Sequence, residues 1–209
     1  MEFGHEEIVE YDRQKANNLT NEIKNYERII FEGHSTDYQS SKALKELVED
    51  GVAILKVGPA LTFAVREALF ALYEIEKELY KYELEVKESN FKDILDMAML
   101  ENPMNWKEHY HGSERELKLA RKYSYSDRAR YYYLIPSVIK SMNRLITNLN
   151  NKNIPKTLLS QYMPIQYKKI REGKLSDAPE DLIKDRVKEV LSEYSLACNS
   201  YKKENLWNM

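Results

Sequence analysis

The sequence has 209 residues, with 32 Lys and Arg against 34 Asp and Glu, which gives a net charge of −2. A chain of this length forms one large domain or two small ones, and a hydrophobic content of 43% is enough for a substantial core. The near balance of charge gives no electrostatic reason to expect nucleic acid or an anionic membrane as a partner.

The single cysteine and the apolar segments favour a reducing, cytoplasmic location. Cys198 cannot form an internal disulfide, and we expect it to be a buried, unreactive thiol on the apolar side of the last helix. The first residues lack the apolar core of a secretion signal. The longest apolar segment, residues 60–75, is broken by Arg66 and Glu67, so we expect no membrane span.

The first 60 residues alternate between helical and strand patterns. Residues 11–26 carry Ala16, Leu19 and Ile23 at helical spacing, and the short β-branched and aromatic run 28–34 predicts a strand that ends at Gly33. The segment 40–51 predicts a helix with Ser40 or Ser41 as its N-cap and Gly51 as its stop.

The next strand completes a β–α–β pattern. The run "VAILKVG", residues 52–58, is nearly continuously apolar, which is typical of a parallel strand covered on both faces. A helix over residues 62–82 follows, with Thr62 available as its N-cap.

Beyond about residue 90 the strand signals fade, and we predict an all-helical second half. Its clearest helix has Ser176 or Asp177 near the cap and Pro179 in the first turn.

Polar side chains follow the two predicted strands at their carboxyl ends, where parallel α/β folds bind ligands. Hydroxyl, amide, carboxylate and amino groups in this position suit a sugar phosphate, and backbone amides at the following helix start could add to them. Turn and cap chemistry explains the same residues equally well. The candidate binding residues are His34, Ser35, Thr36, Asp37, Gln39, Lys56, Gly58 and Thr62.

The histidines give little support for a metal. A catalytic zinc needs about three protein ligands, and His5, His109 and His111 lie far from His34 in sequence. No nucleophilic Ser-His-Asp or Cys-His arrangement, P-loop or G-x-G-x-x-G pattern is present. We therefore assign no catalytic residue and no cofactor.

The segment "RKYSYSDRARYYYLIP", residues 121–136, interleaves tyrosines with arginines and lysine. It is superficially similar to a surface that stacks bases and contacts phosphates. In a near-neutral chain we prefer a buried polar cluster at a helical junction, with Asp127 and Glu116 pairing with the arginines.

Two long stretches, "IFEGHSTDYQS" and "AILKVGPALTFAVREALFALYEIEKEL", resemble the GatZ/KbaZ family, the non-catalytic subunit of class II tagatose-1,6-bisphosphate aldolase. The resemblance continues through "SYSDRARYYY" and "IPKTLLSQYMPIQYKKIREGKLS" to the last helix. It implies an α/β fold: the C-terminal part of a TIM (β/α)8 barrel in residues 1–90, followed by an all-helical extension in residues 91–209.

The resemblance also implies a function and a departure from the family. It implies a partner, the zinc-dependent catalytic aldolase subunit, whose activity and stability this chain supports; the zinc is expected on that partner. Family chains are roughly twice as long, and a barrel needs about 250 residues. We therefore expect a fragment that begins in mid-barrel, from a truncated or split reading frame. Two alternatives stay open: an aldolase or isomerase that uses His34 and Asp37 in acid–base or metal chemistry, and a sugar-phosphate-binding module.

Overall fold

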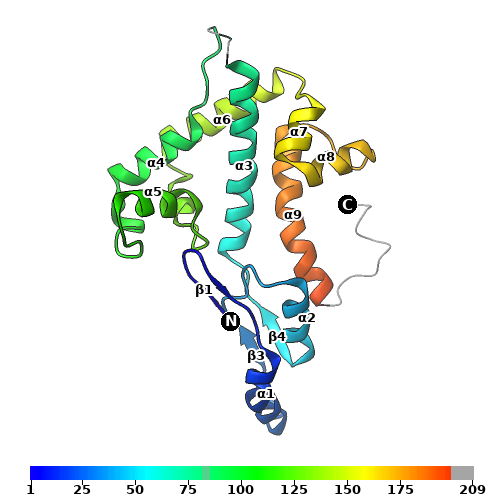
Figure 1. The fold of residues 1–209 in the computed structure, drawn as a ribbon. Coiled ribbons are helices and arrows are strands. Elements are labelled where there is room, and N and C mark those ends of the chain that lie inside the picture. Colours follow the sequence, from blue (N-terminus) through cyan, green and yellow to red (C-terminus); the bar gives the residue numbers. More distant parts are fainter. Residues whose placement is uncertain (82, 84, 199–209) are drawn as a thin grey trace.

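The computed structural model describes residues 1–81, 83 and 85–198, and within them the protein is mostly helical, with two short two-stranded sheets (Figure 1). Single 3-10 turns lie at Ile23–Asn25, Pro103–Asn105 and Arg128–Tyr132. In chain order the other elements are β1 (Glu2–Phe3), β2 (Ile8–Val9), α1 (Arg13–Glu22), β3 (Phe31–Gly33), α2 (Ser41–Glu49), β4 (Val52–Leu55), α3 (Pro59–Tyr80), α4 (Phe91–Glu101), α5 (Glu114–Tyr123), α6 (Pro136–Asn150), α7 (Lys156–Tyr162), α8 (Pro164–Arg171) and α9 (Pro179–Ala197).

The predicted β–α–β unit is confirmed. Strands β3 and β4 pair in parallel, with Gly33 opposite Leu55, and α2 connects them. Helix α2 begins where the Ser40 hydroxyl accepts a hydrogen bond from the amide of Ala43. It ends before Gly51, which has φ +93°, a conformation that glycine adopts without a steric penalty. The carboxyl ends of both strands therefore lie at one edge of the sheet.

The prediction that the second strand is covered on both faces is wrong. Val52 is buried beside α2, but Ala53 and Ile54 of the same strand are exposed. A small apolar cluster of α2, β4 and the end of α9 covers only one face. In the part of the chain described, the sheet has only these two strands, so no further strand lies beside either of them.

Helix α3 is the long central helix of the protein, and it starts earlier than predicted. Pro59 occupies its first turn and Gly58 is the N-cap, so the expectation that Thr62 caps this helix is wrong. Proline is favoured there because its missing N–H is not needed and its φ is already helical. The helix ends at Tyr80; the predicted last residue, Tyr82, lies outside the described residues.

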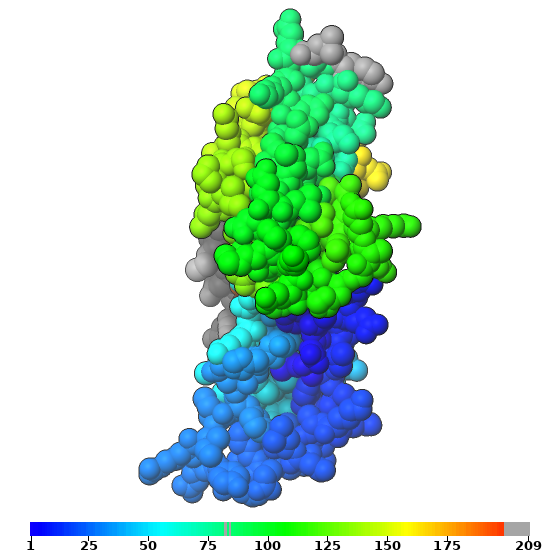
Figure 2. All heavy atoms as spheres, turned by 90° about the vertical axis from the view of Figure 1, so that its left-hand side faces the viewer, coloured from blue at the N-terminus to red at the C-terminus, as the bar shows by residue number. Residues whose placement is uncertain are grey.

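The second half is all-helical through residue 198, and its helices pack around α3. One large apolar core joins α3 to α4, α6, α7 and α9, with Leu72, Leu145 and Leu159 completely buried. Helix α9 then runs back beside α3 to α2 (Figure 1). Figure 2 shows an elongated molecule with the N-terminal residues in blue at one end and α4 and α5 in green above them. The domain boundary at residue 90 stays a prediction, and residues 199–209 lie outside the described part.

The last helix begins as the sequence indicated. Pro179 lies in its first turn, and the Ser176 hydroxyl accepts a hydrogen bond from the Ala178 amide just before it. The prediction for Cys198 is wrong, because this residue caps the helix and is exposed. No helix among the described residues is both long enough and apolar enough to cross a membrane.

Candidate functional site

Three ionisable side chains contact one another on the solvent-exposed carboxyl edge of the β3–β4 sheet. His34 and Lys56 follow the two strands, and both contact Glu32 of β3: His34 Nε2 lies 2.8 Å from Glu32 Oε1, and Lys56 forms an ion pair with it. The His34 and Lys56 side chains are 66% and 52% exposed. The hydrogen bond from Lys56 holds the pKa of Glu32 below its usual range. The ammonium group is thus accessible, but it already has a carboxylate partner.

Asp37 lies behind this edge and holds the start of α3. It is 3% exposed, and its Oδ1 accepts hydrogen bonds from the amides of Gly58 at 2.8 Å and Ala60 at 2.9 Å. Free amides at a helix start attract anions. Here the carboxylate of Asp37 occupies the position at the start of α3 where the sequence predicted a bound phosphate. Gly58, one of the predicted binding residues, donates its N–H to this carboxylate.

Thr36 and Gln39 are likewise occupied by contacts within the protein. The Thr36 hydroxyl donates to the carbonyl of Lys56 at 2.5 Å and lies 3.0 Å from the Tyr194 hydroxyl of α9. The Gln39 amide accepts from the Tyr11 N–H at 2.7 Å and donates to a carbonyl of β2. Both side chains are buried. Ser35 is exposed, with φ 55°, and makes none of these contacts.

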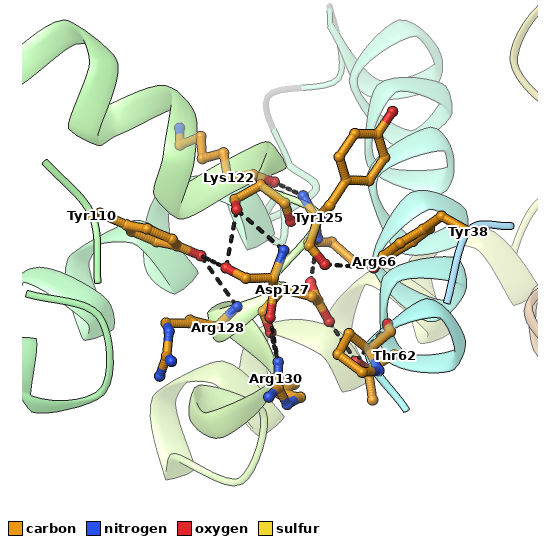
Figure 3. A network of polar contacts seen from close by, with 12 residues as sticks. Tyr38, Thr62, Arg66, Tyr110, Lys122, Tyr125, Asp127, Arg128 and Arg130 are labelled. Carbon is orange, nitrogen blue, oxygen red and sulfur yellow. Dashed lines mark hydrogen bonds and ion pairs between the residues drawn. The ribbon is translucent and has the colours of Figure 1, made fainter. Parts of the chain in front are cut away.

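Thr62 belongs to a second, deeper polar cluster, which is shown in Figure 3. Its hydroxyl donates to Asp127 Oδ2 at 2.5 Å, and Arg66 Nε donates to Asp127 Oδ1 at 2.7 Å. Arg66 also donates to the carbonyls of Lys122 and Ser124. Burial raises the pKa of Asp127, and the nearby Arg66 opposes that shift. Thr62 therefore does not lie with His34 and Lys56 in a single pocket.

The predicted buried polar cluster in residues 121–136 is confirmed, but the expected pairing of Asp127 and Glu116 with the arginines of this segment is wrong. Glu116 bonds to Ser113 in a capping box at the start of α5, and among the described residues it pairs with no arginine. The partner of Asp127 comes from α3, where Arg66 stands in a run of apolar residues. In the sequence, the only sign of the Arg66–Asp127 contact was that Arg66 interrupts the apolar face of a predicted helix.

Tyr38 connects the two clusters, and sequence analysis did not single it out. Its hydroxyl donates to the Tyr125 carbonyl at 2.6 Å, and its ring packs against Phe3, Phe63 and Tyr125. Burial raises the pKa of this phenol. Its left-handed backbone, with φ 64°, is uncommon for a bulky residue. Tyr38 therefore fixes the strand-end loop to the helical half.

The described residues contain no group of three or more His, Cys, Asp or Glu side chains that could hold a metal ion. His109 and His111 are exposed on the loop before α5, and His5 packs edge-on against Tyr110. His34 has Glu32 as a neighbour, which leaves it short of the about three protein ligands of a catalytic zinc site.

Residues 1–199 match the family described as D-tagatose-1,6-bisphosphate aldolase subunit GatZ/KbaZ-like. The chain belongs to this family. A solved structure that matches this chain is a protein from Sinorhizobium meliloti 1021, whose title describes it as a probable tagatose 6 phosphate kinase. It is 42% identical, superposes with a TM-score of 0.88, and the match covers 94% of this chain and 50% of that one. The chain thus spans about half the length of that protein.

Proposed function

We propose that this chain supplies the closing strands and the helical extension of a β/α-barrel accessory subunit. In this proposal it performs no chemistry itself and supports the activity and stability of a separate, zinc-dependent tagatose-1,6-bisphosphate aldolase subunit. The observation that carries the proposal is the hydrogen bonding of Asp37. This buried carboxylate at the strand ends accepts hydrogen bonds from the amides of Gly58 and Ala60 at the start of α3, so it is not available to bind a substrate.

The barrel part of the proposal is supported by the sheet and by the solved relative. Parallel strands joined by a helix are the repeating unit of a β/α barrel, and such strands are normally covered on both faces. Here Ile54 is exposed and the sheet stops at two strands within the described residues. Further β/α units would cover this face, and the match leaves half of the longer solved chain in which such units could lie.

The accessory role is supported by the family description and by the state of the candidate residues. The family is described as an aldolase subunit. Thr36, Asp37 and Gln39 are buried and bonded within the protein, so the acid–base enzyme hypothesis keeps only His34 of its two residues. A subunit that binds only the folded form of its partner stabilises that partner by mass action.

The direct test titrates this chain into a purified catalytic class II aldolase subunit. We expect cleavage of tagatose-1,6-bisphosphate and the melting temperature of the catalytic subunit to rise together, and the chain alone to be inactive. Asp37→Ala, which frees the start of α3, should reduce both effects, and the exposed change Glu108→Gln should not. Unchanged activity and melting temperature at saturating chain, or turnover by the chain alone, would overturn the proposal.

A second candidate, binding of a sugar phosphate, is favoured by the exposed Lys56 and His34 at the strand ends. A phosphate there would compete with Glu32 for the ammonium group. Calorimetry with tagatose-1,6-bisphosphate tests it: we expect saturable heat that Lys56→Ala abolishes and Lys42→Ala, on the exposed surface of α2, leaves intact. Binding that survives Lys56→Ala would place the ligand elsewhere.

A further inference from the structure

A groove of about 600 Å³ runs between α3, α8 and α9 and reaches Tyr38 and Gln39 of the strand-end loop at one end; we call it the α3–α9 groove. Its walls are mainly apolar: Phe63 and Ala68 of α3, Ile165 of α8 and Val190 of α9 are among its lining residues. Along α3 the lining extends from Ala60 to Ala71. At 1.5 Å per residue this is about 16 Å, or three helical turns. Figure 1 shows α3 and α9 side by side, with α8 at one end.

The charged residues that line the groove leave it negative. Glu67, Glu189 and Glu193 stand against one cation, Arg186, so three negative charges and one positive charge give −2. Arg186 contacts Glu67 at 2.5 Å and Glu189 at 3.3 Å. Lys169, just outside the lining, contacts Asp185 at 2.8 Å and Glu189 at 3.4 Å. Adding Lys169 and Asp185 to the count leaves the sum at −2.

Glu193 is the carboxylate of the groove that lacks a direct partner. Among the described residues it forms no hydrogen bond and no ion pair, and it is exposed; desolvation by the groove wall raises its pKa, and Arg186 opposes that shift. A nearby cation favours the ionised form of a carboxyl group that lies beside an apolar wall. The side-chain amides of the groove are occupied: Gln166 donates to Asp185 and Glu189, and Gln39 bridges backbone groups near β2.

The open shape and the occupied amides of the groove fit a polypeptide better than a small molecule. Small-ligand sites are usually enclosed and present a few free, convergent polar groups. This groove is open along three turns of α3, and Ile165 on its rim is 54% exposed. Helix-in-groove recognition uses an elongated apolar floor of this kind, and complementary rim charges select the partner.

We propose that the α3–α9 groove binds a basic amphipathic segment of the catalytic aldolase subunit, with its apolar side against Ile165 and Val190 and a Lys or Arg side chain on Glu193. This inference rests on the accessory role proposed above and adds the location and the chemistry of the contact.

The experiment measures the dissociation constant between this chain and the purified catalytic aldolase subunit by calorimetry at low and high salt. Glu193→Lys places like charge opposite the basic segment, and we expect it to weaken binding about five-fold or more at low salt. We expect that loss to shrink at about 0.5 M salt, where exposed charges are screened. Ile165→Asp should weaken binding about ten-fold at both salt concentrations.

Matched control variants repeat the same changes elsewhere on the surface. Glu108→Lys lies on the loop before α5, and Leu100→Asp lies on the outer face of α4, where Leu100 is 51% exposed. Both should bind like the wild type. Melting temperatures of all four variants show whether each is folded. Should Ile165→Asp fail to fold, the salt-dependent effect of Glu193→Lys decides alone.

The outcomes separate this inference from the function on which it rests. If the wild-type chain does not bind the catalytic subunit, the accessory role itself fails. If the wild type binds and Glu193→Lys and Ile165→Asp bind equally well, the role stands and the groove is not the interface. If Leu100→Asp weakens binding and the groove variants do not, the interface lies on α4 and the inference is overturned.

Discussion

Arg66 of α3 donates through Nε to Oδ1 of Asp127 at 2.7 Å, across 61 residues of sequence, and both side chains are almost completely buried. Thr62, one turn before Arg66, donates to the other oxygen of the same carboxylate. This contact joins the helix that leaves the strand ends to the loop that carries the tyrosine and arginine segment. Asp37 and Asp127 therefore bind successive turns of α3, Asp37 at its start and Asp127 one turn later.

Removing Arg66 should be strongly destabilising. Arg66→Ala leaves Asp127 as a buried carboxylate without its cation, and we expect the free energy of unfolding to fall by about 3–5 kcal/mol. Urea denaturation measures the change. Arg13→Ala, which breaks partly exposed ion pairs with Glu49 and Asp50, is the control and should cost at most about 1 kcal/mol. Equal losses in the two variants would contradict the importance of the buried pair.

Asp37 should tolerate replacement by asparagine much better than by alanine. Asp37→Ala leaves the amides of Gly58 and Ala60 without their acceptor, which should cost about 2–3 kcal/mol of unfolding free energy. Asp37→Asn keeps an oxygen in place and loses mainly the favourable charge at the helix start, about 1 kcal/mol. Thermal and urea unfolding of both variants test this order. An asparagine variant as unstable as the alanine variant would show that the negative charge itself is required.

Glu76 should be sensitive even to a change as small as Glu76→Gln. Its completely buried carboxylate accepts hydrogen bonds from the amide and hydroxyl of Ser89 and from Asn148. Glutamine offers one acceptor oxygen and turns an NH₂ group toward a donor, so we expect a loss of about 1–3 kcal/mol. The exposed Glu78→Gln on the same helix should be neutral in the same denaturation experiment. A neutral Glu76→Gln would contradict the importance of these hydrogen bonds for stability.

The open face and edges of the β3–β4 sheet predict self-association of the isolated chain. Ile30, just before β3, is 62% exposed, and Ile54 of β4 is 43% exposed. Unpaired edges beside apolar side chains favour pairing between copies. Light scattering after size exclusion should therefore give a mass above that of the monomer, and Ile30→Lys with Ile54→Lys should lower it. Leu134→Lys, elsewhere on the surface, should have no effect. A compact wild-type monomer at roughly 100 μM would contradict the prediction.

The pKa of Glu32 should depend on Lys56, whose hydrogen bond is the largest cause of its lowering. In Lys56→Ala we expect that pKa to rise toward its ordinary value of 4.5. Because the folded-state pKa is lowered, the stabilising contact is fully present above about pH 4.5 and is lost as the pH falls through the lowered value. NMR titration of the side-chain carboxyl measures both values, with Lys42→Ala as the control. An unchanged pKa in Lys56→Ala would assign the shift to another group.

The local elements followed from short stretches of sequence. The cap at Ser40, the stop at Gly51 and the first-turn proline of α9 were all predicted, because each depends on backbone groups within a few residues of the signal. Parallel pairing of β3 and β4 followed from the spacing of two apolar runs around one helix. The buried polar cluster in residues 121–136 followed from tyrosines and arginines in a near-neutral chain.

The tertiary structure decided which residues distant in sequence contact each other and which faces of the helices and strands are covered. The partners of Asp37 lie 21 and 23 residues away and the partner of Asp127 lies 61 residues away, so no local pattern distinguishes a cap or a buried pair from a ligand site. Apolar periodicity marks Leu19 and the run at Ile54 as faces to be covered, yet both residues are exposed. A helix or strand carries its pattern within itself, whereas the layer that covers it comes from elsewhere in the sequence or from another chain.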